Sequence, residues 1–590
     1  MKQSNKVFPV KYYTQNQFEY SDSVSYLLNI LVDFHNYQQK NTLGNIGLVN
    51  NDFVYKSMRT FGFNYGRNNY QNYFYTPGNL KFYDTRIPLS DLFYVFGTKQ
   101  EQYFKLVFSY NLKKNWNVTV DFSRIKSAGF YPNLVPDHTF LALSSNYRSL
   151  NNRYMLLVSA CFNTIKNTEN GGLIEDSTFF KGHLKASDFP LKSSSNYRRN
   201  RNFFIKQYFN LGHRANDTLP VIPTSRFIVT SEYDEMAQRY RDSNPRGVPE
   251  FYPAIYNDSV LTLDTSHVAK LSNELAWKRT DNLKHRGVLD MLGVGASIKH
   301  QLVMVKQLQL ENIFNNVLAG FELCNLYSNH KFWWKVIYNT GLNGYNKGDN
   351  QLYAIASKGI LDSLSRVFIS YKSAVYSPDF MYNKYLSNHF RWTNNFNKVN
   401  EQSITAGISI PKYDFALNVD YTNYKNVLYF DTAAIARQFD GSVNIISVQL
   451  KKNFNFFNWH LNNNVLYQQV PDSSVIRVPQ FILQHSLFYE HDVFKKAMHV
   501  QIGLELFYNT AFYSNAYMPV TGEFYLQNDS KYGAYPMFDF FLNMKIKVVN
   551  AFFKIEHLNS GFSGNNYMLT PHYVMAPRTF KLGVSWKLFD

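Results

Sequence analysis

Hydrophobic and polar residues alternate with a period of two along most of the chain. Residues 104–111 carry an apolar side chain at nearly every second position, and residues 116–123 repeat the pattern after a connection short enough for a tight hairpin. The same alternation returns in residues 415–422, 459–468 and 538–547. Because successive side chains of a strand point to opposite faces, these runs predict strands with one apolar face. Several reach the roughly 9–11 residues that a strand needs to cross a bilayer.

The polar face of these runs favours a membrane barrel over its alternative, a soluble β-rich protein with an aromatic core. Asn, Gln, Lys and Asp dominate that face, which suits a wet lumen, and aromatic residues collect near the expected strand ends, as at 12–13, 332–334 and 512–513. Aromatic residues make up 17% of the chain, yet the mean hydropathy is only −0.34. That combination fits a barrel, because only alternate residues of its strands face lipid.

The longest apolar run, residues 26–34, is interrupted by Asn29 and Asp33 and is far short of the roughly 20 residues of a spanning helix. The chain can therefore span a bilayer only as a closed sheet, in which every backbone group is paired. We predict an all-β fold, a single large antiparallel transmembrane β-barrel of about 22–26 strands with long extracellular loops. The barrel is expected over residues 51–590, and residues 1–50 are expected to form an N-terminal extension that is periplasmic, lumenal or an extra strand.

The expected connections differ in length, as in bacterial barrels with short periplasmic turns and long external loops. Short connections are expected near residues 113, 151, 328, 400 and 458. Long ones are expected over residues 127–137, 166–199, 235–264, 375–385 and 559–577.

The N-terminus, the cysteines and the net charge say less about the fold and the function than the alternation does. Met1–Pro9 is basic but no apolar stretch of signal length follows, so we expect that a signal peptide was removed or truncated before this start, and that the protein resides in the cell outer membrane. Cys161 and Cys324 fit as ordinary strand residues. The net charge of +18 suits either a basic lumen or contact with anionic lipid headgroups and lipopolysaccharide; no nucleic-acid-binding motif accompanies it, so nucleic acid is not an expected partner.

The C-terminal strand resembles the assembly signal of outer-membrane barrels. In that signal a polar residue is followed two positions later by glycine and then by alternate aromatic or large apolar residues; Lys581, Gly583, Trp586 and Leu588 match it, with Phe589 as the terminal aromatic. Phe580, Leu582 and Val584 complete the apolar face. The resemblance implies that the barrel-assembly machinery is a partner during biogenesis, through pairing with the strand edge.

A series of short landmarks resembles the "putative porin" family of Bacteroidota outer membranes. The order of the fragments, more than any one of them, carries the resemblance, which runs from about residue 30 to the end. The landmarks include residues 34–37, 45–47, 83–85, 101–102, 129–131, 169–172, 387–390, 557–559 and 577–590. It implies an outer-membrane barrel but says little about substrate, because a fold does not fix function.

Motifs for metal, phosphate or nucleophilic chemistry are missing from the sequence, so we expect no enzyme, no cofactor and no metal. Glu169, at the start of the long 166–199 connection, and the basic cluster Arg198, Arg199 and Arg201 are candidates for a loop or pore mouth; the arginines could also face lipopolysaccharide or simply solvent. A turn is the expected role of residues 169–172, with a Ca²⁺ site using Glu169, Glu175 and Asp176 as the alternative. His389 is expected to be a satisfied strand or rim residue.

The expected function is that of a porin, which lets small polar solutes diffuse passively through a polar lumen and prefers anions if enough Lys and Arg face inward. The main alternative is a non-conducting barrel, closed by its loops or its N-terminal segment, that serves as a subunit or scaffold of a larger outer-membrane assembly with other outer-membrane proteins. A lipid-acting barrel enzyme is a third hypothesis, and it would need a Ser/His pair at the membrane rim.

Overall fold

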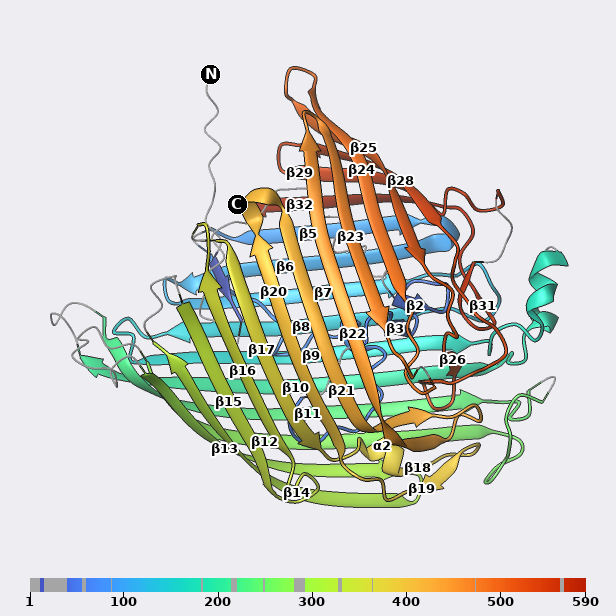
Figure 1. The fold of residues 1–590 in the computed structure, drawn as a ribbon, viewed down its shortest axis with the longest axis horizontal. Helices are drawn as coiled ribbons and strands as arrows, with labels where there is room; N and C mark the ends of the chain where they lie inside the picture. The colour runs from blue at the N-terminus through green and yellow to red at the C-terminus, as the bar shows by residue number, and fades with distance from the viewer. Residues whose placement is uncertain are drawn as a thin grey trace.

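The computed structural model describes residues 11–14, 40–55, 60–85, 87–181, 184–213, 220–247, 250–280, 292–326, 332–362, 364–472, 474–562 and 567–589. Twenty-two antiparallel strands close into one barrel in chain order, and the last strand pairs with the first, Lys581 lying opposite Gly97 (Figure 1). The all-β antiparallel barrel predicted from the alternation is thus confirmed, with a strand number inside the predicted range. Among the described residues, no helix is long and apolar enough to cross a membrane.

The first half of the wall consists of β5 (Leu89–Gly97), β6 (Glu101–Lys113), β7 (Trp116–Lys126), β8 (Asp137–Arg148), β9 (Tyr154–Glu169), β10 (Ser194–His213), β11 (Ile222–Asp242), β12 (Thr262–Arg279), β13 (Leu292–Gln307), β14 (Leu310–Asn325) and β15 (Phe332–Asn343). The second half consists of β16 (Asn350–Gly359), β17 (Arg366–Tyr376), β20 (Val399–Ile410), β21 (Phe415–Phe430), β22 (Ala436–Phe456), β23 (Trp459–Gln469), β24 (Phe481–Val493), β25 (Met498–Asn509), β28 (Met537–Ile546), β29 (Val549–Glu556) and β32 (Thr579–Phe589).

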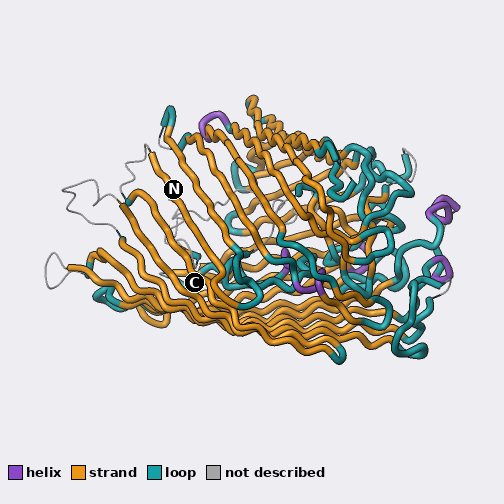
Figure 2. The backbone as a smooth tube through the Cα atoms, turned by 60° about the horizontal axis from the view of Figure 1, so that its bottom comes forward, coloured by secondary structure: helices purple, strands orange, loops and turns teal. Residues whose placement is uncertain are grey.

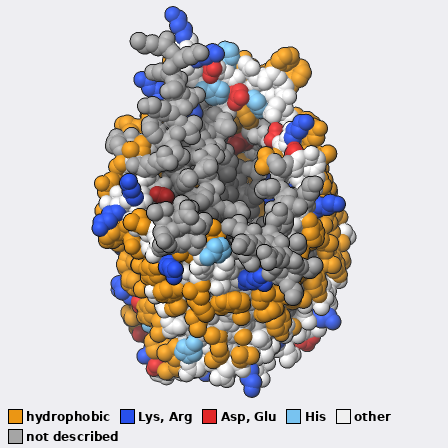
Figure 3. Space-filling view, turned by 90° about the vertical axis from the view of Figure 1, so that its left-hand side faces the viewer, with side chains coloured by type: hydrophobic (Ala, Val, Ile, Leu, Met, Phe, Trp, Pro, Cys, Tyr) orange, Lys and Arg blue, Asp and Glu red, His pale blue; other side chains and the backbone are white. Residues whose placement is uncertain are grey.

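The two faces of the wall follow the alternation of the sequence. On β7, Asn117, Thr119 and Asp121 are buried inside the barrel, whereas Trp116 and Val120 are exposed on the outside. Hydrophobic side chains accordingly cover much of the outer surface seen in Figure 3. An apolar exterior and a polar interior are what a barrel in lipid requires.

The two ends of the barrel differ in the length of their connections. Residues 114–115, 149–153, 411–414 and 457–458 turn at one end, where the last strand also ends, while the connections at the other end include residues 170–193, 243–261, 377–398, 510–536 and 557–578. We refer to these as the short-turn end and the long-loop end, and the latter is extracellular in barrels of this kind. The short connection expected near residue 400 is not found, because Asn400 lies in β20 and the turn follows at residues 411–414.

The wall begins at Leu89, later than the residue 51 expected from the sequence. The described residues before it, 40–55 and 60–85, lie inside the barrel, where β2 and β3 appear in Figure 1; we call them the lumen segment. Their side chains and backbone bond to strands on several sides of the wall. These hydrogen bonds join Gly47 to His138 on β8 (2.7 Å), Tyr75 to Asn163 on β9 (2.9 Å), Phe63 to Gln301 on β13 (3.3 Å) and Phe53 to Gln468 on β23 (3.0 Å).

Most of the lumen segment is irregular, and its regular pieces are short. Two-stranded sheets form from β1 (Lys11–Tyr13) with β4 (Phe82–Asp84), and from β2 (Lys40–Thr42) with β3 (Asn50–Asp52). The tube in Figure 2 shows such loop-like chain surrounded by the strands of the wall. Of the three roles left open for residues 1–50, the described residues 40–50 lie in the lumen, while residues 1–10 and 15–39 are outside the described residues.

Three loops from the long-loop end pack in the lumen together with the lumen segment. They contain the hairpins β18 (Lys384–Leu386) with β19 (Arg391–Thr393), β26 (Ala516–Met518) with β27 (Glu523–Tyr525), and β30 (Met568–Thr570) with β31 (Tyr573–Val574); the helix α2 (Phe380–Asn383) precedes β18. Aromatic and aliphatic residues of the lumen segment, the loops and the wall pack into one buried cluster that includes Phe63, Phe380, Trp392, Met518, Val303 and Phe430. The core of the protein therefore lies inside the barrel rather than between two sheets.

Candidate functional site

The lumen segment meets the loops of the long-loop end at a set of directional contacts. The Arg67 guanidinium donates a hydrogen bond to the Tyr385 hydroxyl (3.0 Å), and that hydroxyl donates to the carbonyl of Val520 (3.2 Å). Backbone N–H groups of Phe380 and Met381 donate to carbonyls in the lumen segment at 3.0 and 2.9 Å. Three separate parts of the chain thus form one closure across the barrel.

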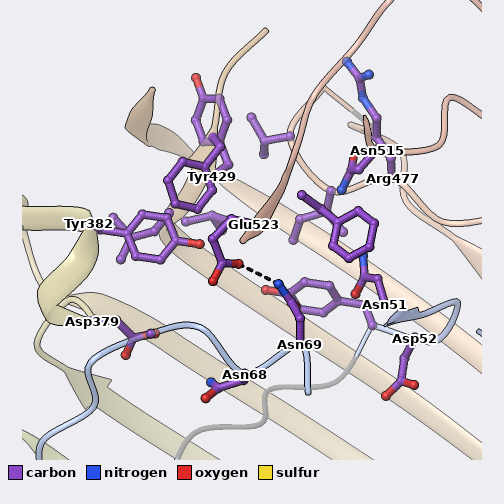
Figure 4. Close-up of a pocket in the computed structure, with 18 of the residues that line it drawn as sticks. Asn51, Asp52, Asn68, Asn69, Asp379, Tyr382, Tyr429, Arg477, Asn515 and Glu523 are labelled. Atoms are coloured by element: carbon purple, nitrogen blue, oxygen red, sulfur yellow. Dashed lines mark hydrogen bonds between the residues drawn. The ribbon is translucent and has the colours of Figure 1, made fainter. Parts of the chain in front are cut away.

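A cavity of about 320 Å³ lies at this junction. Figure 4 shows its lining, which comes from the lumen segment, the loop that holds α2, the β27 hairpin and the wall. Amide side chains predominate among the polar groups, and tyrosines supply much of the apolar surface. The residues labelled in the figure are Asn51, Asp52, Asn68, Asn69, Asp379, Tyr382, Tyr429, Arg477, Asn515 and Glu523.

The charge of the lining does not favour anions. The lining holds the carboxyl groups of Asp52, Asp379 and Glu523 and the guanidiniums of Arg67 and Arg477, so positive charge is not in excess. Amides can both donate and accept hydrogen bonds, and tyrosine offers an apolar ring beside a hydroxyl. Such a lining suits neutral solutes rich in hydroxyl groups more than it suits phosphates or carboxylates.

Glu523 connects the β27 hairpin to the lumen segment. Asn69 donates through its amide to one carboxylate oxygen of Glu523 (3.0 Å) and to the carbonyl of Gly522 (2.8 Å). Burial raises the pKa of Glu523 to about 7, although the positive charge of Arg67 and the hydrogen bond from Asn69 act in the opposite direction. The other carboxylate oxygen has no hydrogen-bond partner among the described residues.

The residues singled out from the sequence fall at different places in the wall. Arg198 and Arg199 lie in β10 rather than in the long connection expected over residues 166–199, because that strand begins at Ser194, and Arg201 follows them in the same strand. Because successive side chains of a strand point to opposite faces, the three arginines do not share one face of the wall. Arg198 points into the lumen, where it donates to the carbonyl of Arg67 (2.8 Å), while Arg199 forms an ion pair with Glu235 (3.3 Å) on the outer face.

Glu169, the last residue of β9, is fully buried in the lumen. Its carboxylate accepts hydrogen bonds from Asn196 (2.9 Å) and from the hydroxyl of Tyr517 (3.5 Å), which lies in the loop between β25 and β28, and it does not reach solvent. Asp176 bonds instead to His572 (3.0 Å) and Tyr532 (2.9 Å), and Glu175 is exposed. Among the described residues, no group of three or more His, Cys, Asp or Glu side chains could hold a metal ion.

His389 is buried in the loop between β17 and β20, with both ring nitrogens engaged. One bonds the Thr262 hydroxyl (2.8 Å), the other bonds the carbonyl of Ala254 (2.9 Å), and the ring stacks on Tyr252 at 4.0 Å. These contacts give it a structural role that positions the loop.

The C-terminal strand presents the two faces read from its sequence. Phe580, Leu582, Val584 and Trp586 are exposed on the outer surface, while Lys581 and Gly583 point inward. Lys581 forms ion pairs with Glu101 (2.7 Å) and Glu556 (2.8 Å) on either side of the strand, across the place where the barrel closes. Leu588 is half-buried, Phe589 ends the strand, and the use of this strand as an assembly signal remains a prediction.

Comparison with solved structures finds the same fold in an iron transporter and in two ferric-siderophore receptors. The FrpB iron transporter of Neisseria meningitidis matches 85% of this chain and 82% of its own with a TM-score of 0.59 at 10% identity. The ferric-catecholate import receptor Fiu of E. coli K12 matches 87% and 84% with a TM-score of 0.56 at 12% identity. The ferric enterobactin receptor PfeA of Pseudomonas aeruginosa, in complex with enterobactin, matches 87% and 83% with a TM-score of 0.59 at 11% identity. At such identity the likeness concerns the fold alone.

No curated protein sequence matches this chain. A family model does, and over nearly the whole sequence, which agrees with the landmarks found in the sequence and with the outer-membrane barrel fold. The chain belongs to the family described as "Putative porin", whose model matches residues 13–590.

Proposed function

We propose that the protein is a porin-like diffusion barrel for small, neutral, polar solutes, and that the lumen segment is its movable closure. The cavity at the junction of the lumen segment and the β27 hairpin carries this proposal. It is lined by amides and Tyr55 of the lumen segment and by Asn515, Glu523 and Phe524 of the loop that holds the β27 hairpin, so a solute held there contacts the two elements that would have to separate for passage. Diffusion needs neither a cofactor nor a chemical step.

The anion preference expected from the net charge is not part of this proposal. The cavity has more carboxylates than guanidiniums, and some of the positive charge lies on the outer face, as at Arg199. Small neutral solutes, such as mono- and disaccharides, fit both the size and the polarity of the cavity.

A disulfide between the lumen segment and the wall tests whether movement of this segment opens the lumen. Leu80 of this segment lies in one buried cluster with Ala142 and the native Cys161 of the wall. In a Cys324→Ser background, Leu80→Cys should form a disulfide with Cys161 on oxidation, which mass spectrometry of the cleaved protein would verify. We expect brief openings in planar bilayers for the reduced protein, none for the oxidised protein, and recovery after reduction.

The matched control carries Leu80→Cys with Cys161→Ser and should conduct whether oxidised or reduced. Equal conductance of the locked and unlocked proteins would refute the lumen segment as the closure. A protein that is folded yet silent in every state would instead support the second candidate, a non-conducting barrel subunit. That candidate is favoured by the hydrogen bonds of the lumen segment to β8, β9, β13 and β23, which tie it to much of the wall.

A further inference from the structure

Basic side chains gather on the outer face of five adjacent strands, close to the long-loop end. They alternate with buried, inward-facing neighbours such as Asn200, Gln238 and Val305, so they point away from the lumen. We call this set the outer basic patch: Lys166 on β9, Arg199 and Arg201 on β10, Arg239 and Arg241 on β11, His267 on β12 and Lys306 on β13.

The register of the strands brings these residues together. Tyr197 lies directly opposite both Lys166 and Arg239, its neighbours on either side. His267 is likewise opposite Lys306 on the next strand. Since neighbouring strands lie about 4.8 Å apart, these residues form one contiguous patch, which covers four successive outward levels of the strands, from Arg241 to Arg201.

The apolar band of the barrel lies on the short-turn side of the patch. Its exposed apolar or aromatic side chains are Phe203 and Ile205 on β10, Tyr233 on β11, Leu271 and Leu275 on β12, and Leu302 and Ile298 on β13. Ala237 and Glu235 lie between the patch and Tyr233, and the polar residues Asn273 and His300 also face outward among these positions. Each of these apolar and aromatic side chains is substantially exposed. The patch therefore lies at the level where the acyl chains of the outer leaflet give way to headgroups.

Most of the positive charge in the patch is not neutralised by the protein. Glu235 pairs with Arg199 (3.3 Å) and His267 (3.2 Å), and Glu311 pairs with Lys306 (3.1 Å). No carboxylate among the described residues lies within ion-pair distance of Lys166, Arg201, Arg239 or Arg241. Arg239 is held over the ring of Tyr197 at 5.5 Å, which orients its guanidinium on the outer face.

We propose that the outer basic patch binds the phosphate groups of an anionic lipid in the external leaflet. Guanidinium groups bind phosphate oxygens with paired, charge-assisted hydrogen bonds, and the apolar side chains on the short-turn side of the patch contact the acyl chains of the same molecule. The partner is a phosphorylated glycolipid, because both its headgroup and its chains meet complementary surface. This inference is independent of whether the lumen conducts.

The test compares two double variants in detergent micelles by native mass spectrometry. Arg239→Gln with Arg241→Gln removes two charges from the patch, and Lys425→Gln with Arg437→Gln removes two exposed charges at the same end of β21 and β22. Purified bisphosphorylated lipid A is the probe, and dephosphorylated lipid A and inorganic phosphate are the comparison ligands. Heat-modifiable migration confirms that both variants are folded.

We expect the unmodified protein and the control variant to retain lipid A, and the patch variant to bind it about tenfold more weakly or worse, since each guanidinium removed takes charge-assisted hydrogen bonds to phosphate with it. Dephosphorylated lipid A should bind weakly to all three proteins. Equal binding of the two lipids, or equal losses in both variants, would overturn the proposal. Competition by millimolar inorganic phosphate would show a free-anion site and would also overturn it.

Discussion

Replacing Lys554 by methionine tests how the barrel is held together near the strand pair that closes it. The ammonium group of Lys554, on β29, is fully buried and lies 2.9 Å from Asp539, 3.4 Å from Glu505 and 3.8 Å from Glu556. Methionine keeps the length of the side chain and removes its charge. The substitution therefore leaves three carboxylates without their shared cation.

The loss of stability expected for Lys554→Met follows from the burial of its ion pairs. Removing one partner of a buried ion pair costs about 3–5 kcal/mol, because the remaining charge stays desolvated. Asp539 is 2% exposed and cannot regain solvation without opening the wall. Lys587 offers the matched control. Its pair with Asp91 spans 3.8 Å and is 22% and 32% exposed, so Lys587→Met should cost only about 0–1 kcal/mol.

The assay is urea-induced unfolding of the barrel in micelles, followed by tryptophan fluorescence, with unfolding and refolding curves required to coincide. Lys554→Met should lower the free energy of unfolding by several times the loss seen for Lys587→Met. Adding Asp539→Asn to Lys554→Met should restore part of the loss, because it removes one of the orphaned charges. Equal losses in the two single variants would mean that water screens the network, and the reasoning from burial would fail.

Two further predictions concern the closing strand and the closure of the lumen. A Cβ at Gly583 would lie 2.0 Å from the ring of Phe552 on the neighbouring strand. Gly583→Ala should therefore destabilise the barrel by about 1–3 kcal/mol in the same urea assay, and adding Phe552→Leu should restore part of this stability. An unchanged free energy of unfolding in Gly583→Ala would show that the Phe552 ring moves freely. Burial raises the pKa of Glu523 to about 7, so its protonated form stabilises the closed contact below the ordinary carboxyl pKa, and this stability is lost as pH rises towards and through 7. Openings in planar bilayers should therefore become more frequent from pH 5 to pH 8, and Glu523→Gln should abolish the dependence; an unchanged dependence in that variant would assign it to another group.

The strands of the wall could be predicted because each one is determined by the pattern of neighbouring residues in the sequence. A strand in lipid must alternate, and the runs at 104–111, 116–123 and 538–547 are found in β6, β7 and β28. The long connections over residues 127–137 and 559–577 are also found, within a few residues. The loop at 510–536 was missed, since its short hairpin carries the same β-type residues as the wall.

The candidate site could not be predicted in the same way, because its contacts join distant parts of the chain. Asn69 and Glu523 are 454 positions apart, and nothing near either residue marks the pair. The arginines at 198–201 show the same limit on a smaller scale. They read as one basic cluster in the sequence, but once β10 is known to include them, alternation sends Arg198 inward and its neighbours outward.

The amide side chains of the inner face acquire a different meaning in the structure. Read from the sequence, Asn and Gln on the polar face indicated a lumen filled with water. A 22-strand barrel is too wide for its wall side chains to fill, and this one holds an irregular segment whose backbone groups have no ladder of their own. Asn163 and Gln468 donate to its carbonyls, and Gln301 accepts from one of its N–H groups. At these positions a side-chain amide replaces water as the hydrogen-bond partner of the buried backbone. The polar inner face of the wall can therefore hold the lumen segment, whose backbone would otherwise need water. Any solute that opens the lumen must release these backbone groups to water rather than leave them unpaired, so opening and hydration of the lumen segment are expected to be one event.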